Sequence, residues 1–140
     1  MNQEYDKTES SPNNKLSVHV RFMLDEFANS VYIPDLEKHL AVCGSHNISV
    51  NITLQCIEQL KTLYKYWDII LNNCGSILFF GCHSVETLKC FSDFIGNQIS
   101  IDQLKTIDTD KCVLNIHDMP TFYGKKFDVE NHINYDKLEK

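Results

Sequence analysis

The stretch that most limits what this chain can fold into is GSILFFGCHSVETLKCF, residues 75 to 91. SILFFG, at 76–81, is an apolar run without polar alternation, which predicts a strand covered on both faces, as in the centre of a parallel sheet. Ser84 is a favourable N-cap for the helix that follows, and Gly96 can end that helix in a left-handed conformation. Side chains at helical spacing predict its buried face: Val85, Leu88, Phe91, Phe94 and Ile95.

The part of the chain before this strand shows three regular patterns. KLSVHVRFML, at 15–24, alternates apolar and polar residues and predicts a half-buried strand, with a helix start as the alternative. Residues 34–44 predict a short helix that begins near Pro34 and ends at Gly44. Residues 52–73 predict one long amphipathic helix, capped by Asn51 and ended by a left-handed Gly75.

The rest of the chain adds a connector and weaker signals. SHNISVN, at 45–51, is a connector or a short strand. ISIDQLKTI, from residue 99, predicts a turn of helix capped by Ser100 or Asp102. KCVLNIHD, at 111–118, predicts a second apolar strand, and the chain after it reads as a loop and a weak polar helix.

Together these elements predict an α/β fold, a small parallel sheet flanked by helices like a trimmed doubly wound, flavodoxin-like domain. In this fold the strands at 76–81 and 111–118 are expected to be parallel. Residues 1–14 are polar and are expected to be a mobile tail. The length of 140 residues suits one core, so residues 15–140 are expected to form a single domain.

Composition excludes several classes of protein. The net charge is −6 and Arg21 is the only arginine, which argues against a nonspecific nucleic-acid binder and against DNA as a partner. The apolar runs are far shorter than the roughly 20 residues that a membrane helix needs. The N-terminus resembles neither a secretory signal nor a mitochondrial presequence. The six cysteines are expected to be reduced and mostly buried.

One family resemblance rests on the order of these segments. Asn47-Ile-Ser-Val-Asn51, the helix after it and GSILFFG resemble a segment of small-subunit ribosomal protein two, and DKCVLNIHD resembles that family's later strand. The resemblance covers 47–118. The chain differs in having Cys82-His83 where the family usually carries Thr-Lys, and it lacks the family's Arg-Trp-Leu-Gly-Gly segment.

The resemblance implies a reduced, mitochondrial-type member of the family. Such a protein would be a structural constituent of the small ribosomal subunit, with ribosomal proteins and small-subunit rRNA as partners. A mitochondrial location follows from the resemblance, with the cytoplasm as the alternative. A third possibility is an accessory structural subunit of another organelle assembly.

The residues themselves show no catalytic constellation, so we expect a protein that is not an enzyme and has neither cofactor nor metal. Cys82 is most simply structural, and carboxylates such as Asp25, Glu26 and Asp35 are expected to be solvated or capping groups. An enzyme-class alternative is an anionic ligand held at the 81–86 turn by free backbone N–H groups. The residues expected to contact an anion or an rRNA phosphate are Ser84, Val85, Lys125 and Lys126.

Overall fold

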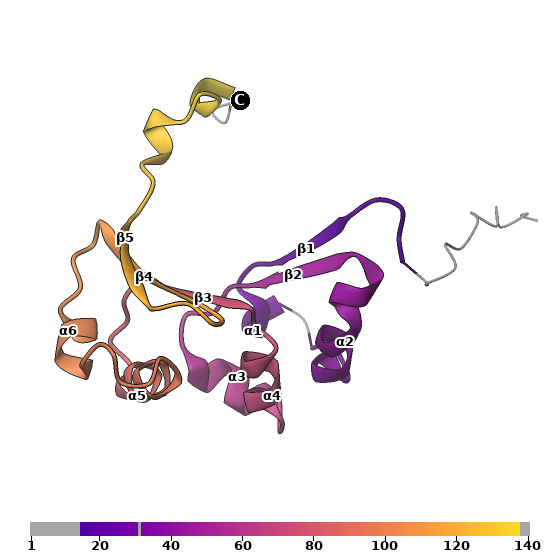
Figure 1. The fold of residues 1–140 in the computed structure, drawn as a ribbon, viewed down its shortest axis with the longest axis horizontal. Coiled ribbons are helices and arrows are strands. Elements are labelled where there is room, and N and C mark those ends of the chain that lie inside the picture. Colours follow the sequence, from indigo (N-terminus) through magenta and orange to yellow (C-terminus); the bar gives the residue numbers. More distant parts are fainter. Residues whose placement is uncertain (1–14, 31, 138–140) are drawn as a thin grey trace, which may run out of the picture. The chain divides into compact units, whose positions relative to one another are not determined.

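The computed structural model of this chain describes residues 15–30 and 32–137. It has the expected α/β architecture, with a small parallel sheet, a separate antiparallel sheet and flanking helices (Figure 1). The chain divides after Cys74 into two compact units. None of the helices in the described residues is long and apolar enough to span a membrane. The tail predicted at 1–14 lies outside the described residues, and the single domain at 15–140 stays a prediction.

Unit 1 is built around two parallel strands. The strands β1 and β2 pair from Val20 opposite Ile48 to Leu24 opposite Ile52, which confirms a small parallel sheet. The strand predicted at 15–24 is confirmed for its second half, and the connector at 45–51 contains a strand. The elements of the unit are β1 (Val20–Leu24), α1 (Phe27–Ser30), α2 (Leu36–Cys43), η1 (Gly44–His46), β2 (Ile48–Ile52), α3 (Ile57–Leu63) and α4 (Trp67–Asn72).

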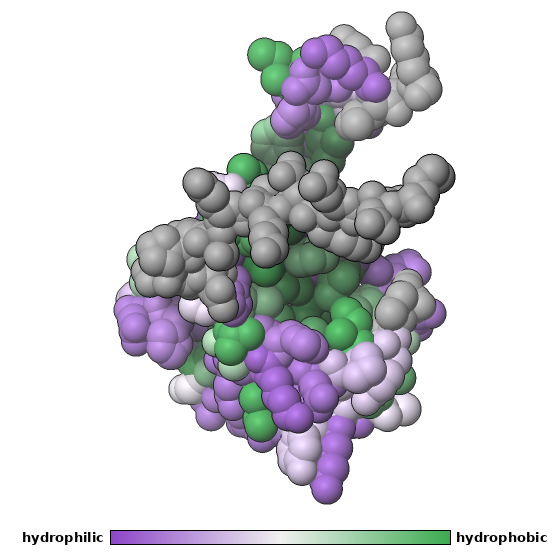
Figure 2. All heavy atoms as spheres, turned by 90° about the vertical axis from the view of Figure 1, so that its right-hand side faces the viewer, coloured by the Kyte–Doolittle hydropathy of each residue, from purple (hydrophilic) through white to green (hydrophobic). Residues whose placement is uncertain are grey.

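This parallel pair is poorly covered within the described residues. Phe22 and Met23 of β1 are exposed on opposite faces of the strand. Figure 2, which shows the side that lies to the right in Figure 1, has apolar side chains at the surface among hydrophilic ones. Parallel sheets are normally covered on both faces, and strand pairs are rarely stable alone. The pair therefore has the character of part of a larger sheet.

The prediction of one long helix at 52–73 is wrong, because the chain forms α3 and α4 with a break between them. Tyr64 lies at the break in an extended conformation, with φ −125° and ψ 119°. Its ring stacks on Phe27 and Tyr32 at centroid distances of 5.8 and 5.2 Å, and its hydroxyl accepts the Ile33 N–H at 3.0 Å. Burial raises the pKa of the Tyr64 hydroxyl. These long-range contacts outweigh the local helical periodicity.

The two ends predicted for that helix are wrong as well. Asn51 lies inside β2, where it continues the parallel ladder, and α3 starts only at Ile57. Gly75 does not adopt a positive φ, which among the glycines is found at Gly81 and Gly96. Gly44 ends α2 as predicted, although in a right-handed conformation that leads directly into η1.

Unit 2 contains an antiparallel sheet in the order β3-β4-β5. Ile77 of β3 lies opposite Asn115 of β4, so the parallel arrangement predicted for 76–81 and 111–118 is wrong. The helices α5 and α6 connect β3 to β4, and the chain re-enters the sheet at the end where β3 leaves it. The elements are β3 (Ser76–Phe79), α5 (Val85–Phe94), α6 (Ile101–Lys105), β4 (Lys111–Ile116), β5 (Phe122–Lys125), η2 (Val129–Asn131) and η3 (Tyr135–Lys137).

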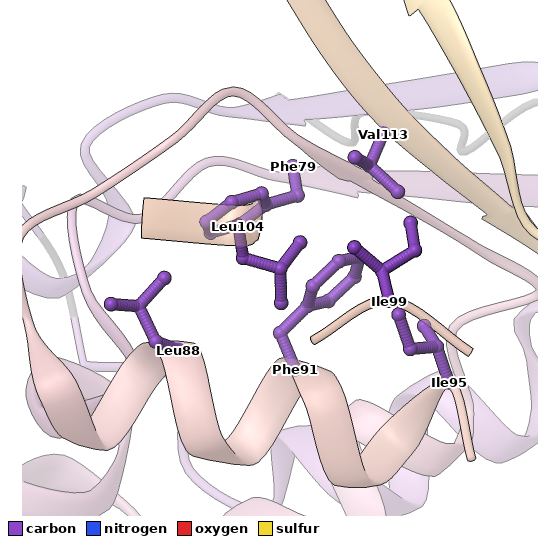
Figure 3. Packing of buried hydrophobic residues seen from close by; sticks show 7 residues of the cluster. All are labelled: Phe79, Leu88, Phe91, Ile95, Ile99, Leu104 and Val113. Atoms are coloured by element: carbon purple, nitrogen blue, oxygen red, sulfur yellow. The ribbon is translucent and has the colours of Figure 1, made fainter. Parts of the chain in front are cut away.

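The core of unit 2 lies between one face of this sheet and its two helices (Figure 3). The rings of Phe79 and Phe91 stack at a centroid distance of 4.7 Å. The buried cluster consists of Phe79, Leu88, Phe91, Ile95, Ile99, Leu104 and Val113. Burying this apolar cluster is the main stabilising contribution to the unit.

The helix predicted after Ser84 is confirmed in position and in its caps. The Ser84 hydroxyl accepts the Thr87 N–H at 3.0 Å, and Gly96 closes the helix with φ 66°. Of the five side chains expected to face the core, Leu88, Phe91 and Ile95 are buried and Phe94 is partly buried. Val85 is exposed, which corrects that prediction.

The strand at 76–81 is covered on one face and not on both. Phe79 is buried against the helices, whereas Leu78 and Phe80 are 47% and 52% exposed. The prediction of a fully covered strand is wrong because this sheet is antiparallel and carries helices on one side, an arrangement that leaves its second face open.

Replacing Gly81 with alanine should destabilise unit 2. Gly81 has φ +96°, and a Cβ atom there would lie 2.9 Å from Cγ2 of Ile107. We expect a loss of about 1–3 kcal/mol in the free energy of unfolding, measured by urea denaturation followed by circular dichroism. Gly75→Ala is the matched control, because a Cβ at Gly75 meets nothing within 4 Å. Equal stability of the two variants would contradict the packing at Gly81.

Candidate functional site: the carboxyl end of the parallel strands

The carboxyl ends of β1 and β2 lie at the same edge of the parallel pair. Beyond the last paired residues, the Thr53 N–H donates to the Leu24 carbonyl at 3.0 Å, and the Phe27 N–H donates to the Thr53 carbonyl at 3.2 Å. These two hydrogen bonds hold the segments after both strands side by side. In open α/β sheets, ligands bind outside the carboxyl ends of parallel strands. This edge is therefore where unit 1 would hold a ligand.

Two exposed carboxylates follow β1 at this edge, Asp25 and Glu26. Glu26 has φ 44°, a left-handed conformation that is uncommon for a residue other than glycine. The turn is held by the Glu26 N–H, which donates to Asp25 Oδ1 at 3.1 Å, and by the Asn29 N–H, which donates to the Glu26 carbonyl at 2.8 Å. Backbone strain of this kind costs about 1–3 kcal/mol and is concentrated at functional sites.

A glutamine in α3 fixes the segment after β2. Gln59 Oε1 accepts the backbone N–H of Gln55 at 3.0 Å and that of Cys56 at 3.4 Å. Gln59 Nε2 donates to Asn29 Oδ1 at 3.5 Å, which links α3 to α1. Gln55 is exposed, so its amide is available at the same edge of the sheet as the two carboxylates.

Carboxylate and amide oxygens are the ligands that Mg²⁺ and Ca²⁺ prefer. Within the described residues, however, no three His, Cys, Asp or Glu side chains come together as a metal site. A cation bound by Asp25 and Glu26 would therefore need further oxygen ligands, which a phosphate group can supply. The chemistry of this edge suits a complex of a metal ion with an anionic ligand better than a metal ion alone.

Asp25 and Glu26 are predicted from the sequence to be solvated or capping groups, and this fits the structure, since both are exposed and Asp25 Oδ1 accepts the Glu26 N–H. In the sequence the two acids directly follow the apolar stretch VRFML. In P-loop NTPases a Walker-B aspartate holds the magnesium ion of the bound nucleotide. Asp35 fits the same interpretation, since it is exposed and pairs with Lys38 at 2.8 Å.

The residues predicted to contact an anion lie in unit 2. Ser84 and Val85 are at the start of α5, where the Ser84 hydroxyl is already used as the helix cap. Lys125 lies in β5, and Lys126 Nζ reaches Phe80, 3.4 Å from its carbonyl oxygen and 5.2 Å from its ring centroid. Anion contact by these four residues stays a prediction.

A protein-family model matches residues 19–110, and its description is the TraM recognition site of TraD and TraG. The chain belongs to this TraG/TraD C-terminal family. The match runs through β1, through the two carboxylates after it and into unit 2 as far as the residue before β4. No curated protein sequence matches the chain.

Solved structures of TrwB have the same fold as this family member. The unbound form of the bacterial conjugative coupling protein TrwB has a TM-score of 0.69 and 14% identity, over 84% of this chain and 33% of TrwB. Plasmid coupling protein TrwB in complex with the non-hydrolysable GTP analogue GDPNP has a TM-score of 0.68 and 13% identity, over 81% of this chain and 32% of that one. The chain thus spans about a third of the length of the solved TrwB chains that it matches.

These findings correct the reading based on ribosomal protein two. The matching family is TraG/TraD, so the ribosomal role, the ribosomal and rRNA partners and the mitochondrial location are all wrong. Neither the anionic-ligand alternative at 81–86 nor the organelle-assembly alternative gains support from the comparisons. The resemblance failed because a helix, a glycine and an apolar strand in this order recur in many α/β folds.

Substitution of Glu26 should reveal the backbone strain at this position. Glu26→Gly and Glu26→Ala both remove the carboxylate, but only glycine adopts a positive φ without a steric cost. We expect the glycine variant to be more stable by about 1 kcal/mol, measured by urea unfolding followed by Trp67 fluorescence in the same unit. Equal stability, or a more stable alanine variant, would show that the backbone at Glu26 is not strained.

Proposed function

We propose that this chain is the partner-recognising part of a bacterial conjugative coupling protein. The observation that carries the proposal is the family match over 19–110, since that family is described as the TraM recognition site of TraD and TraG. The fold similarity to TrwB over 84% of the chain supports the same assignment. The partner in this proposal is a TraM-type protein.

The incomplete sheet of unit 1 supports a role within a larger protein. The pair β1–β2 leaves apolar side chains such as Phe22 and Met23 exposed. A coupling protein of which this chain matches only 33% has further segments that can cover such a pair. The exposed faces of unit 1 are therefore expected to contact other parts of the coupling protein, while the partner binds elsewhere.

The first test is direct binding to a TraM protein. Purified chain should bind purified TraM saturably, with a dissociation constant below about 100 µM, in isothermal titration calorimetry at physiological salt. An unrelated protein of similar size and with the same net charge of −6 is the control, because nonspecific attraction would act on both proteins. Equal heats from the chain and from the control would refute partner recognition.

A second candidate function rests on the carboxylates after β1. Asp25 and Glu26 lie at the carboxyl end of a parallel strand, in the order that a Walker-B strand has in P-loop NTPases. TrwB has been crystallised with GDPNP. We propose that Asp25 and Glu26 hold the metal ion of a bound nucleotide and that Gln55 lies beside its phosphates.

By itself the chain is proposed not to be an enzyme. Its sequence contains no GxxxxGK[ST] segment, so it has no phosphate-binding loop of the P-loop type. Nucleotide hydrolysis would need such a loop from another segment of polypeptide. On this view the chain supplies the metal-binding half of the site, and the phosphate-binding half lies outside it.

The nucleotide proposal predicts where a paramagnetic metal complex will bind. With Mn²⁺ and GDPNP, backbone NMR signals of residues 25–27 and 53–55 should broaden most, because Mn²⁺ replaces Mg²⁺ at oxygen ligands. The double variant Asp25→Asn/Glu26→Gln should abolish this local broadening. The control variant Asp102→Asn changes an exposed carboxylate in the first turn of α6. This variant should leave the local broadening intact. Equal broadening of the backbone signals next to every exposed carboxylate would disprove the site.

A further inference from the structure

The segment between β2 and α3 carries Gln55, and it is held from two sides. Residues 53–56 are neither helix nor strand. At the start of the segment, the Thr53 carbonyl accepts the Phe27 N–H at 3.2 Å. At its end, Gln59 Oε1 accepts the N–H groups of Gln55 and Cys56 at 3.0 and 3.4 Å. The position of Gln55 therefore depends on a side chain of α3 as well as on the sheet.

Gln59 does for α3 what Gln103 does for α6 in unit 2. Each is the third residue of its helix. Gln103 Oε1 accepts the Ser100 N–H at 3.0 Å and the Ser100 hydroxyl at 3.1 Å. Both glutamines thus reach back to the backbone before their helix, as in a capping box. Helix capping is therefore a local function that the two side chains share.

Gln59 also makes a contact far along the chain. Its Nε2 donates to Asn29 Oδ1 at 3.5 Å, across a separation of 30 residues. Asn29 belongs to α1, and its own N–H donates to the Glu26 carbonyl at 2.8 Å. Through Asn29 and Gln59, hydrogen bonds therefore join the turn of Glu26 to the segment after β2. A helix cap does not require this link.

The link is long for a hydrogen bond, whereas the helix that carries it is firmly packed. Polar contacts of unliganded sites are often long and shorten when the ligand binds. Ile57 and Leu60, which lie on either side of Gln59 in the sequence, are 7% and 2% exposed. Beyond the end of α3, Tyr64 stacks on Phe27, the first residue of α1. A side chain on a packed helix positions its partners more precisely than one on a loop.

We propose that Gln59 is a positioning residue for a bound metal–nucleotide complex, because it holds Gln55 at a fixed distance from Asp25 and Glu26. The inference rests on the nucleotide site proposed above. A metal ion on the two carboxylates takes further oxygen ligands from the phosphates, so the complex would bridge the segments after β1 and β2. A small change in their separation then weakens one of its contacts. Gln59 itself touches neither the metal ion nor the nucleotide.

Three variants separate this role from helix capping. Gln59→Met removes both the cap of α3 and the contact with Asn29. Asn29→Ala removes only that contact, because the group that holds the turn of Glu26 is the backbone N–H of Asn29. Gln103→Met is the matched control, since it removes the equivalent cap of α6 and changes nothing in unit 1. Circular dichroism and thermal melting establish that all three variants remain folded.

The measurement is the broadening of backbone NMR signals of the full chain by Mn²⁺ with GDPNP, relative to a reference with Mg²⁺. In the wild type, residues 25–27 and 53–55 should both broaden. In Gln59→Met and Asn29→Ala, the broadening at 53–55 should fall at least about twofold relative to that at 25–27. Paramagnetic broadening falls steeply with distance, and a poorly supported segment shifts by about 1 Å. Gln103→Met should keep the wild-type ratio.

Three results would overturn the inference and leave the metal site at the carboxylates standing. If Gln59→Met keeps the wild-type ratio, as Gln103→Met does, Gln59 is only a helix cap. If Gln59→Met lowers the ratio but Asn29→Ala does not, the link to α1 has no part in positioning. If the wild type broadens at 25–27 alone, Gln55 lies away from the complex.

A fourth result has a different meaning. A wild-type chain without local broadening at either segment would refute the nucleotide site itself, and this inference with it.

Discussion

The parallel pairing of β1 with β2 is the interaction on which unit 1 depends. Its register brings residues 20–24 beside 48–52, although the chain forms two helices between them. Because both strands run in the same direction, their carboxyl ends meet, and Asp25, Glu26 and Gln55 come to one edge. The same pairing leaves apolar side chains of β1 exposed, which suits a segment that works within a larger sheet.

Unit 2 depends on antiparallel pairing of its strands. Its three strands are antiparallel, and the two connecting helices cover only one face of them. The stacked rings of Phe79 and Phe91 bury that face, while Leu78 and Phe80 point to the other side. The second apolar face is a direct result of this topology.

Functional prediction from the sequence failed for a physical reason. The resemblance to ribosomal protein two used 47–118, where an amphipathic helix, a glycine and apolar strands meet packing requirements common to many α/β proteins. Asp25 and Glu26, on which the nucleotide proposal rests, lie outside that range. In one sequence they are two acids after a strand, and only the parallel register shows that the segment containing Gln55 lies beside them.

The sequence by itself determined the local structure of this protein. Helix starts at Ser84 and Ser100, the left-handed Gly96 and the strands at 20–24, 76–79 and 111–116 follow from caps, backbone freedom and apolar patterns. Tertiary structure alone decided the strand directions and the break at Tyr64. Those features depend on contacts between residues distant in the chain, such as the hydrogen bond from the Ile33 N–H to the Tyr64 hydroxyl. Local sequence patterns do not encode such contacts.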